Sequence, residues 1–121
     1  MSYVFTNLES EETIWSPALQ TGSLFVAVCT LVSKSIDKPL GFTDMASDYI
    51  QVDASLFAAF VDDWLNKYLS TENTLLQMEW KPYLVLSIAM LKRLGHKVSS
   101  DSKTGQALID EADTLLPHMP V

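Results

Sequence analysis

The sequence is poor in the residues that disulfides and metal sites require. Cysteine occurs once, as Cys29, so the chain cannot form an internal disulfide. Histidine occurs only at His96 and His118, and neither has a second histidine at the i+4 spacing of a helical metal pair. Because the first residues also lack the basic start and apolar run of a secretion signal, we expect a protein of the reducing cytoplasm that holds no metal.

The sequence also lacks the short motifs that identify common enzymes. It contains no glycine-rich phosphate loop, no paired-cysteine metal spacing, no His-Glu-x-x-His and no Glu-x-x-His. Cys29 lies in an apolar stretch, which favours core packing over a role as a nucleophile. We therefore expect no cofactor and favour a protein that is not an enzyme. An enzyme or small-ligand carrier without a recognisable motif is kept as an alternative.

Positive charge is scarce as well. Eight Lys and Arg residues stand against 15 Asp and Glu residues, so the formal charge is −7 and the sequence pI is about 4.5. Such a surface repels phosphate groups, which argues against direct nucleic-acid binding and against an anionic membrane. The acidic excess leaves a DNA-mimic inhibitor of a nucleic-acid-binding protein as another alternative. The excess is modest, however, and mimicry needs a dense carboxylate array.

The hydrophobic content is that of an ordinary globular protein. Hydrophobic residues make up 48% of the 121 residues and charged residues 19%, which predicts one helical domain over residues 1–121. The most apolar stretch is Tyr83–Met90, in which Ser87 is the only polar residue. A helix that is apolar on every side must be surrounded by others, so residues 82–95 are predicted to form the central helix.

Capping residues and apolar spacing predict further helices on both sides of this one. Thr6 and Glu9 fit a capping box, which predicts a short acidic helix ending near Trp15. Residues 22–33 have β-branched residues at alternate positions, but no comparable strand exists to pair with them, so a helix opening at Ser16-Pro17 is favoured. Further helices are expected over residues 43–50, 54–69 and 72–80 and in a last segment that ends before Pro117.

These elements together predict an all-α fold, a compact bundle of five or six helices around the central helix. The residues expected in its core share an apolar side chain at helical spacing and are Val28, Leu31, Phe57, Phe60, Val61, Trp64, Leu84, Leu86, Ile88, Leu91, Leu108 and Leu115.

Aromatic residues at element ends are the first candidates for a contact surface. Trp15, Trp80 and Tyr83 lie beside predicted helix ends, where aromatic side chains often anchor partners. Asp62 and Asp63 lie on the polar side of the helix over residues 54–69, where they could steer an encounter. The simpler interpretation places the aromatic side chains in the core and the carboxylates on a solvated face.

A group of cations follows the central helix. Lys92, Arg93, His96 and Lys97 come close together in the sequence and are candidates for binding an anion or an acidic partner. The simpler interpretation is that they complement the negative end of the helix dipole. A binding site requires their side chains to converge.

A small acidic chain without catalytic spacing favours binding over turnover. We expect a protein-interaction module of the inhibitor, immunity, adaptor or chaperone type that acts by binding another protein. The 48% hydrophobic content in so short a chain also favours a homodimer.

Overall fold

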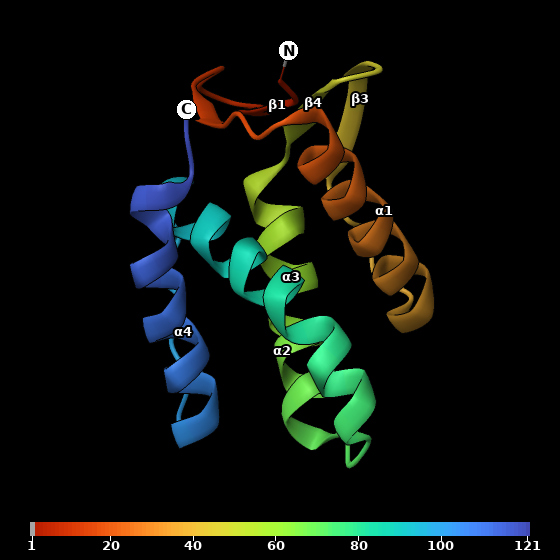
Figure 1. The fold of residues 1–121 in the computed structure, drawn as a ribbon, viewed down its shortest axis with the longest axis vertical. Coiled ribbons are helices and arrows are strands. Elements are labelled where there is room, and N and C mark those ends of the chain that lie inside the picture. The colour runs from red at the N-terminus through yellow and green to blue at the C-terminus, as the bar shows by residue number, and fades with distance from the viewer. Residues whose placement is uncertain (1) are drawn as a thin grey trace.

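The computed structural model describes residues 2–121 and places a mixed β-sheet at one end of a group of helices (Figure 1). The prediction of an all-α bundle is therefore wrong, because this is an α/β fold. The strands are β1 (Val4–Asn7), β2 (Thr13–Trp15), β3 (Phe42–Ala46) and β4 (Tyr49–Val52), and the helices are α1 (Leu19–Ile36), α2 (Ala54–Ser70), α3 (Thr74–Arg93), α4 (Lys103–Leu115) and the short 3₁₀ helix η1 (Leu116–His118).

The sheet has the strand order β2-β1-β4-β3. Its two central strands, β1 and β4, are parallel, and the outer strands pair with them antiparallel. Phe5, Ile50 and Val52 on the central strands are fully buried against the helices, whereas β3 is an exposed edge strand. The sheet thus closes one end of the helical core.

The first predicted helix is replaced by β1, β2 and the tight connection between them. The Asn7 side chain accepts from the Glu9 amide at 3.0 Å, and Ser10 Oγ accepts from the Glu12 amide at 3.3 Å. Glu11 has a positive φ of 62°. Asn and Ser side chains form such turns as readily as they cap helices, so the capping-box pattern was not specific to a helix.

The predicted helix over residues 43–50 is replaced by the hairpin of β3 and β4. Phe42 lies opposite Val52 and Asp44 opposite Ile50, with an irregularity in the register between Asp44 and Ala46. Strands of four or five residues are too short to show a clear alternation, and a bulge shifts the pattern by one residue. The apolar spacing that suggested a helix arose from this short, irregular hairpin.

The longer helices agree better with the sequence. Residues 19–36 form α1, which confirms the choice of helix over strand for residues 22–33. Helix α2 over residues 54–70 agrees with the predicted helix over residues 54–69, and Asp53 caps it, since its Oδ1 accepts from the Leu56 amide at 3.1 Å. The two helices predicted on either side of Pro82 are one continuous helix, α3, which begins after the Asn73 cap and contains Pro82.

Aromatic rings form a continuous series of contacts from the sheet to the helices. Phe5 of β1 lies 5.7 Å from Phe25 of α1 between ring centroids, and Phe42 lies 5.2 Å from Phe57 of α2. The series continues along α2 to Trp64, whose ring is 6.2 Å from that of Trp80 on α3. These contacts fix the sheet against α1 and α2.

Most of the residues predicted to form the core are buried, namely Phe57, Phe60, Val61, Trp64, Leu84, Ile88, Leu91 and Leu108. The exceptions are Val28, Leu31, Leu86 and Leu115. Val28, Leu86 and Leu115 are only partly buried, and Leu31 is 67% exposed. The protein therefore leaves a specific subset of its apolar residues uncovered.

Helix α1 is the least covered of these elements relative to its apolarity. It is long and apolar enough to cross a membrane by length and composition, yet only 22% of its 18 residues are buried. Core helices of soluble proteins and signal sequences meet the same criterion, so this property does not identify a membrane protein. It does show that much apolar surface of α1 faces outward.

Candidate functional site

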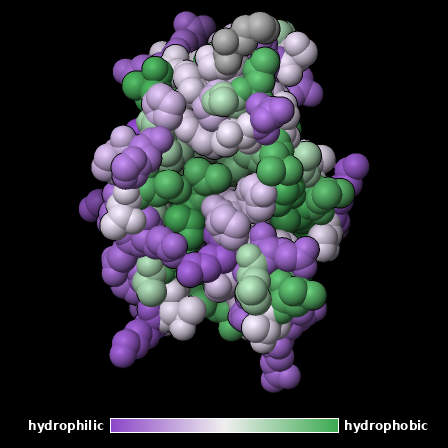
Figure 2. Space-filling model, viewed as in Figure 1, coloured by the Kyte–Doolittle hydropathy of each residue, from purple (hydrophilic) through white to green (hydrophobic). Residues whose placement is uncertain are grey.

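The four predicted core residues that are not fully buried lie on helices of one face of the molecule. Val28 and Leu31 lie on α1, Leu86 on α3 and Leu115 on α4. In Figure 1 these three helices form the near face, and Figure 2 shows hydrophobic patches on that face separated by more polar atoms. Two grooves run beside α3, one toward α4 and one toward α1, and Pro82 lines both.

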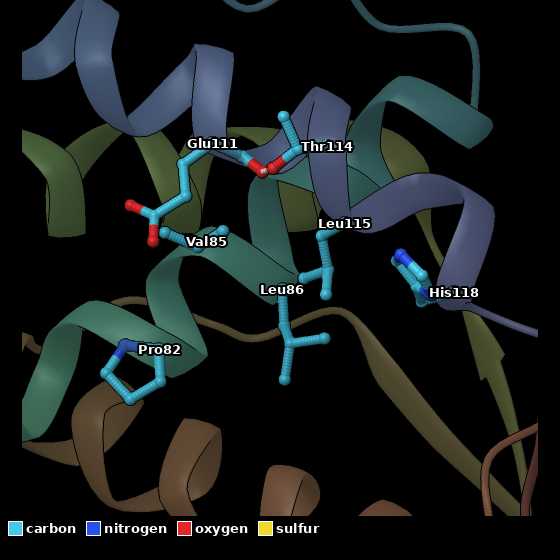
Figure 3. A pocket seen from close by; sticks show the side chains of 7 residues that line it. All are labelled: Pro82, Val85, Leu86, Glu111, Thr114, Leu115 and His118. Carbon is cyan, nitrogen blue, oxygen red and sulfur yellow. Dashed lines mark hydrogen bonds between the residues drawn. The ribbon is translucent and has the colours of Figure 1, made fainter.

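The groove between α3 and α4 is the more apolar of the two, and we call it the α3–α4 groove. It has a volume of about 570 Å³ and is open to solvent. Figure 3 shows Val85, Leu86 and Leu115 gathered between the two helices, with Glu111 and His118 on opposite sides of this apolar group. Its lining residues are Pro82, Val85 and Leu86 from α3, Glu111, Thr114 and Leu115 from α4, and His118 from η1.

Helix α3 positions its half of the groove through its own core contacts. Leu84 and Ile88 are fully buried and hold α3 against the interior. Leu86 lies between these two positions in the sequence and therefore points away from the interior, toward α4 and solvent. Because Val85 is itself 4% exposed, it forms the floor of the groove while Leu86 and Leu115 form its walls.

One ion pair lies beside the groove. Lys81 Nζ is 3.4 Å from Glu111 Oε2, and the two side chains are 48% and 49% exposed. An ion pair this exposed contributes roughly 0–1 kcal/mol, so it is easily exchanged for another cation. Glu111 is the only carboxylate among the lining residues, and its α4 neighbours Asp110 and Asp113 are also exposed.

The second groove, which we call the α1–α3 groove, has a volume of about 520 Å³. Leu31 and Met78 on its rim are each 67% exposed, whereas Trp80 and Tyr83 are partly buried. Its lining residues are Val28, Leu31 and Val32 from α1 and Leu76, Met78, Glu79, Trp80, Pro82 and Tyr83 from α3.

Two of the three aromatic residues chosen from the sequence thus lie together on a groove, and the third does not. Trp80 and Tyr83 both line the α1–α3 groove. Trp15 is only 3% exposed, and its ring lies 5.4 Å from Phe5 and 5.3 Å from Phe25 between centroids. Trp15 is therefore part of the core beneath the sheet and offers no surface to a partner.

The acidic candidates lie on α2, away from both grooves. Asp63 Oδ2 is 3.7 Å from Lys67 Nζ one turn further along the helix. Asp62 lines a small hollow of about 160 Å³, to which His96 and Lys97 also contribute. One carboxylate and two of the four basic candidates are thus brought together, in a space much smaller than either groove.

The other two basic candidates are occupied by contacts within the protein. Lys92 donates to the Ile109 carbonyl at 3.1 Å and lies 2.5 Å from Asp113 Oδ1. Arg93 donates to the Ile14 carbonyl at 2.8 Å and to the Leu116 carbonyl at 2.7 Å. Lys92 and Arg93 therefore bind the β2 and α4 regions to α3, and they do not converge with His96 and Lys97 on one anion site.

Within residues 2–121, no group of three or more His, Cys, Asp and Glu side chains is arranged to hold a metal ion. Cys29 is fully buried, and its Sγ is 3.8 Å from Ser87 Oγ. Burial raises the pKa of the Cys29 thiol from 9.0 to about 12, against a smaller lowering by the Ser87 hydrogen bond. A thiol in this state is a packing group with little nucleophilic character.

Sequence reasoning missed the α3–α4 groove because it assigned Leu86 and Leu115 to the core. Their apolar spacing is the same as that of buried residues, so periodicity alone could not distinguish them. The acidity of α4 was interpreted only as a solvated face, although Glu111 borders the groove.

The family of unknown function DUF6086 matches the chain over residues 1–121, so the chain belongs to this family. No curated protein and no solved structure matches it.

Proposed function

We propose that this member of the DUF6086 family acts by binding another protein, and that the α3–α4 groove accepts a basic amphipathic helix of the partner. The observation that carries the proposal is the open apolar groove lined by Val85, Leu86 and Leu115. Contiguous apolar surface exposed on one face of a folded protein commonly marks an interaction site.

The shape of the groove favours a helix as the ligand. Two helices form its walls, and the apolar residues lie between them rather than at the bottom of a closed cavity. A helix lying in such a groove contacts it through apolar residues spaced i, i+3 or i+4, and i+7. The partner helix would place one such residue on each side of Leu86.

The charge around the groove favours a basic partner. Glu111 is the only Asp, Glu, Lys or Arg among the residues that line the groove, and the whole chain has a net charge of −7. A Lys or Arg on the partner can take the place of Lys81 beside Glu111 at little cost, because the existing ion pair is half exposed. Exposed Asp110 adds to the attraction at longer range, whereas Asp113 is already paired with Lys92.

The expected affinity is modest. Complete burial of a leucine side chain contributes about 1.5–3 kcal/mol, and Leu86 and Leu115 are already partly buried. Covering these two leucines therefore contributes only a few kcal/mol to the free energy of binding, and the entropy lost on association offsets part of that contribution. A dissociation constant on the order of micromolar is the reasonable expectation.

A peptide-display selection tests the proposal without knowledge of the partner. Random peptides are selected on the protein and compared with a selection on Leu86→Asp, which places a carboxylate in the groove. Leu75→Asp is the matched control, because Leu75 lies on the same helix, is 66% exposed and lines neither groove. Circular dichroism and thermal unfolding establish that both variants remain folded.

The proposal expects enriched peptides with apolar residues at helical spacing and an excess of Lys and Arg. These peptides should bind the protein and Leu75→Asp alike and should lose at least about tenfold in affinity for Leu86→Asp. Enrichment of acidic peptides, or equal binding to a folded Leu86→Asp, would contradict it.

A further inference from the structure

We propose that the α1–α3 groove and the outer side of α1 form a self-association face, on which a second copy of this chain docks. The face is defined by Leu24, Val28 and Leu31 of α1 and by Met78 and Tyr83 of α3. The face adjoins the α3–α4 groove, since Pro82 borders both, but none of these five residues lines that groove.

The spacing on α1 suits the packing of one helix against an identical helix. Its inner stripe, which includes Phe25, Cys29 and Val32, is buried against the core. A second stripe, formed by Leu24, Val28 and Leu31, follows the i, i+4, i+7 spacing of coiled-coil contacts and faces outward. Val at position a with Leu at position d is the combination that favours pairs of helices.

Charge indicates a second copy of this chain in preference to a charged partner. Two copies each carry a net charge of −7 and repel one another over most of their surfaces. Among the four α-helices described for residues 2–121, α1 alone has no Asp or Glu, and Lys34 is its only charged residue. Two such copies can therefore approach along α1 without bringing carboxylates of that helix together, and Glu79 of α3 is the single carboxylate that lines the adjoining groove.

The face is large enough for a weak but specific dimer. Helix α1 has 18 residues, and a face made of it and its neighbour is about 27 Å long and about 20 Å wide. Two copies joined there would cover on the order of 1,000 Å² in total, the lower limit for a specific interface. Leu24 and Leu31, which are 52% and 67% exposed, would be covered in such a pair.

Sedimentation velocity over a wide range of protein concentration tests this inference, with Leu31→Asp as the disrupting variant. Leu56→Asp is the control, because Leu56 is 42% exposed and lies at the start of α2, outside the face. The protein and the control should form dimers, and Leu31→Asp should raise the dimer dissociation constant at least about tenfold. A concentration-independent monomer, or an unaltered dimer of Leu31→Asp, would overturn it.

Cross-linking locates the contact independently of stability. Val28 lies at the middle of the stripe, so a two-fold axis between paired α1 helices brings the two copies of Val28 together whether the helices run parallel or antiparallel. Val28→Cys should form a covalent dimer on mild oxidation, whereas Leu56→Cys should not, and the buried Cys29 leaves both results clear. Failure of Val28→Cys to cross-link would reject a second copy as the occupant of this face. The same conclusion would follow if the protein floated with phosphatidylcholine vesicles and Leu31→Asp abolished that flotation. Neither experiment depends on a peptide in the α3–α4 groove, so either proposal can fail while the other stands.

Discussion

Lys81 Nζ lies 3.4 Å from Glu111 Oε2 and joins α3 to α4 beside the α3–α4 groove. The pair is half exposed, so its contribution to the free energy of unfolding is small. Its position makes Lys81 a competitor for the cation that we expect a partner helix to bring to Glu111. The apolar groove and this ion pair together predict how charge substitutions should act on binding.

Replacing Lys81 by Met should strengthen the binding of basic helical peptides, and replacing Glu111 by Gln should weaken it. Each substitution should change the free energy of unfolding by less than about 1 kcal/mol, since an exposed ion pair contributes no more than that. Peptide titrations at two salt concentrations, monitored by tryptophan fluorescence or calorimetry, measure the affinity of each variant. Weaker binding to a folded Lys81→Met would show that Glu111 does not receive the partner's cation.

Leu84→Ala and Leu86→Ala should differ in stability although the residues are two positions apart on α3. Leu84 is fully buried, so its truncation leaves a cavity and should cost about 2–5 kcal/mol. Leu86 lines the α3–α4 groove, so its truncation should cost about 1 kcal/mol or less. Urea denaturation of both variants provides the comparison. Equal losses would place Leu86 in the core, as the sequence alone suggested.

Gly22→Ala should destabilise the protein although alanine is the better helix former. A Cβ at position 22 would lie 2.5 Å from Tyr3 Cγ, and Tyr3 is itself buried, so α1 would have to move away from the residue that precedes β1. Overpacking of this kind costs about 1–3 kcal/mol, and the gain of roughly 1 kcal/mol in helix propensity offsets only part of that cost. Ser23→Ala, at the exposed neighbouring position, is the control and should be neutral or slightly stabilising. A Gly22→Ala protein more stable than the original would refute this close packing.

The stability of the protein should fall above about pH 9 partly because of Cys29. Burial raises the pKa of this thiol from 9.0 to about 12, so between these values the unfolded chain loses a proton that the native protein retains. The free energy of unfolding then decreases as pH rises, by about 1.4 kcal/mol from this group between pH 8 and pH 10.

Denaturation of the protein and of Cys29→Ala at these two pH values isolates that contribution. Tyr3, whose pKa is raised by burial and by Asp44 and Asp48, titrates in both proteins and cancels in the difference. An identical pH dependence, or rapid reaction of the native thiol with a disulfide reagent at pH 8, would contradict the burial of Cys29.

The long helices could be predicted because their signals are redundant. Helix α2 has a clear apolar side and a side-chain cap at Asp53, and both signals indicate the same element. The strands could not be predicted because each has only three to five residues, and β1 pairs with β4 across more than forty positions of the sequence. Pairing at that distance leaves no mark in a local pattern.

The candidate site was only partly predictable for a related reason. Trp80 and Tyr83 were chosen for their place at element ends, and both line a groove. Leu31 and Leu86 have the spacing of core residues, and only the arrangement of α1, α3 and α4 shows that Leu31 is exposed and that Leu86 is only partly covered. A pattern reports which residues are apolar, whereas the fold decides which of them are covered.

The most direct test of the account is to map a bound basic amphipathic peptide on the protein by the amide chemical shifts of an isotopically labelled sample. Binding in the α3–α4 groove predicts that the largest changes occur at Val85, Leu86, Thr114 and Leu115, and that they vanish in Leu86→Asp and persist in Leu75→Asp. Changes centred on α2 or on the sheet, with the amides of Leu86 and Leu115 unaffected, would contradict the claim that this groove is the binding site.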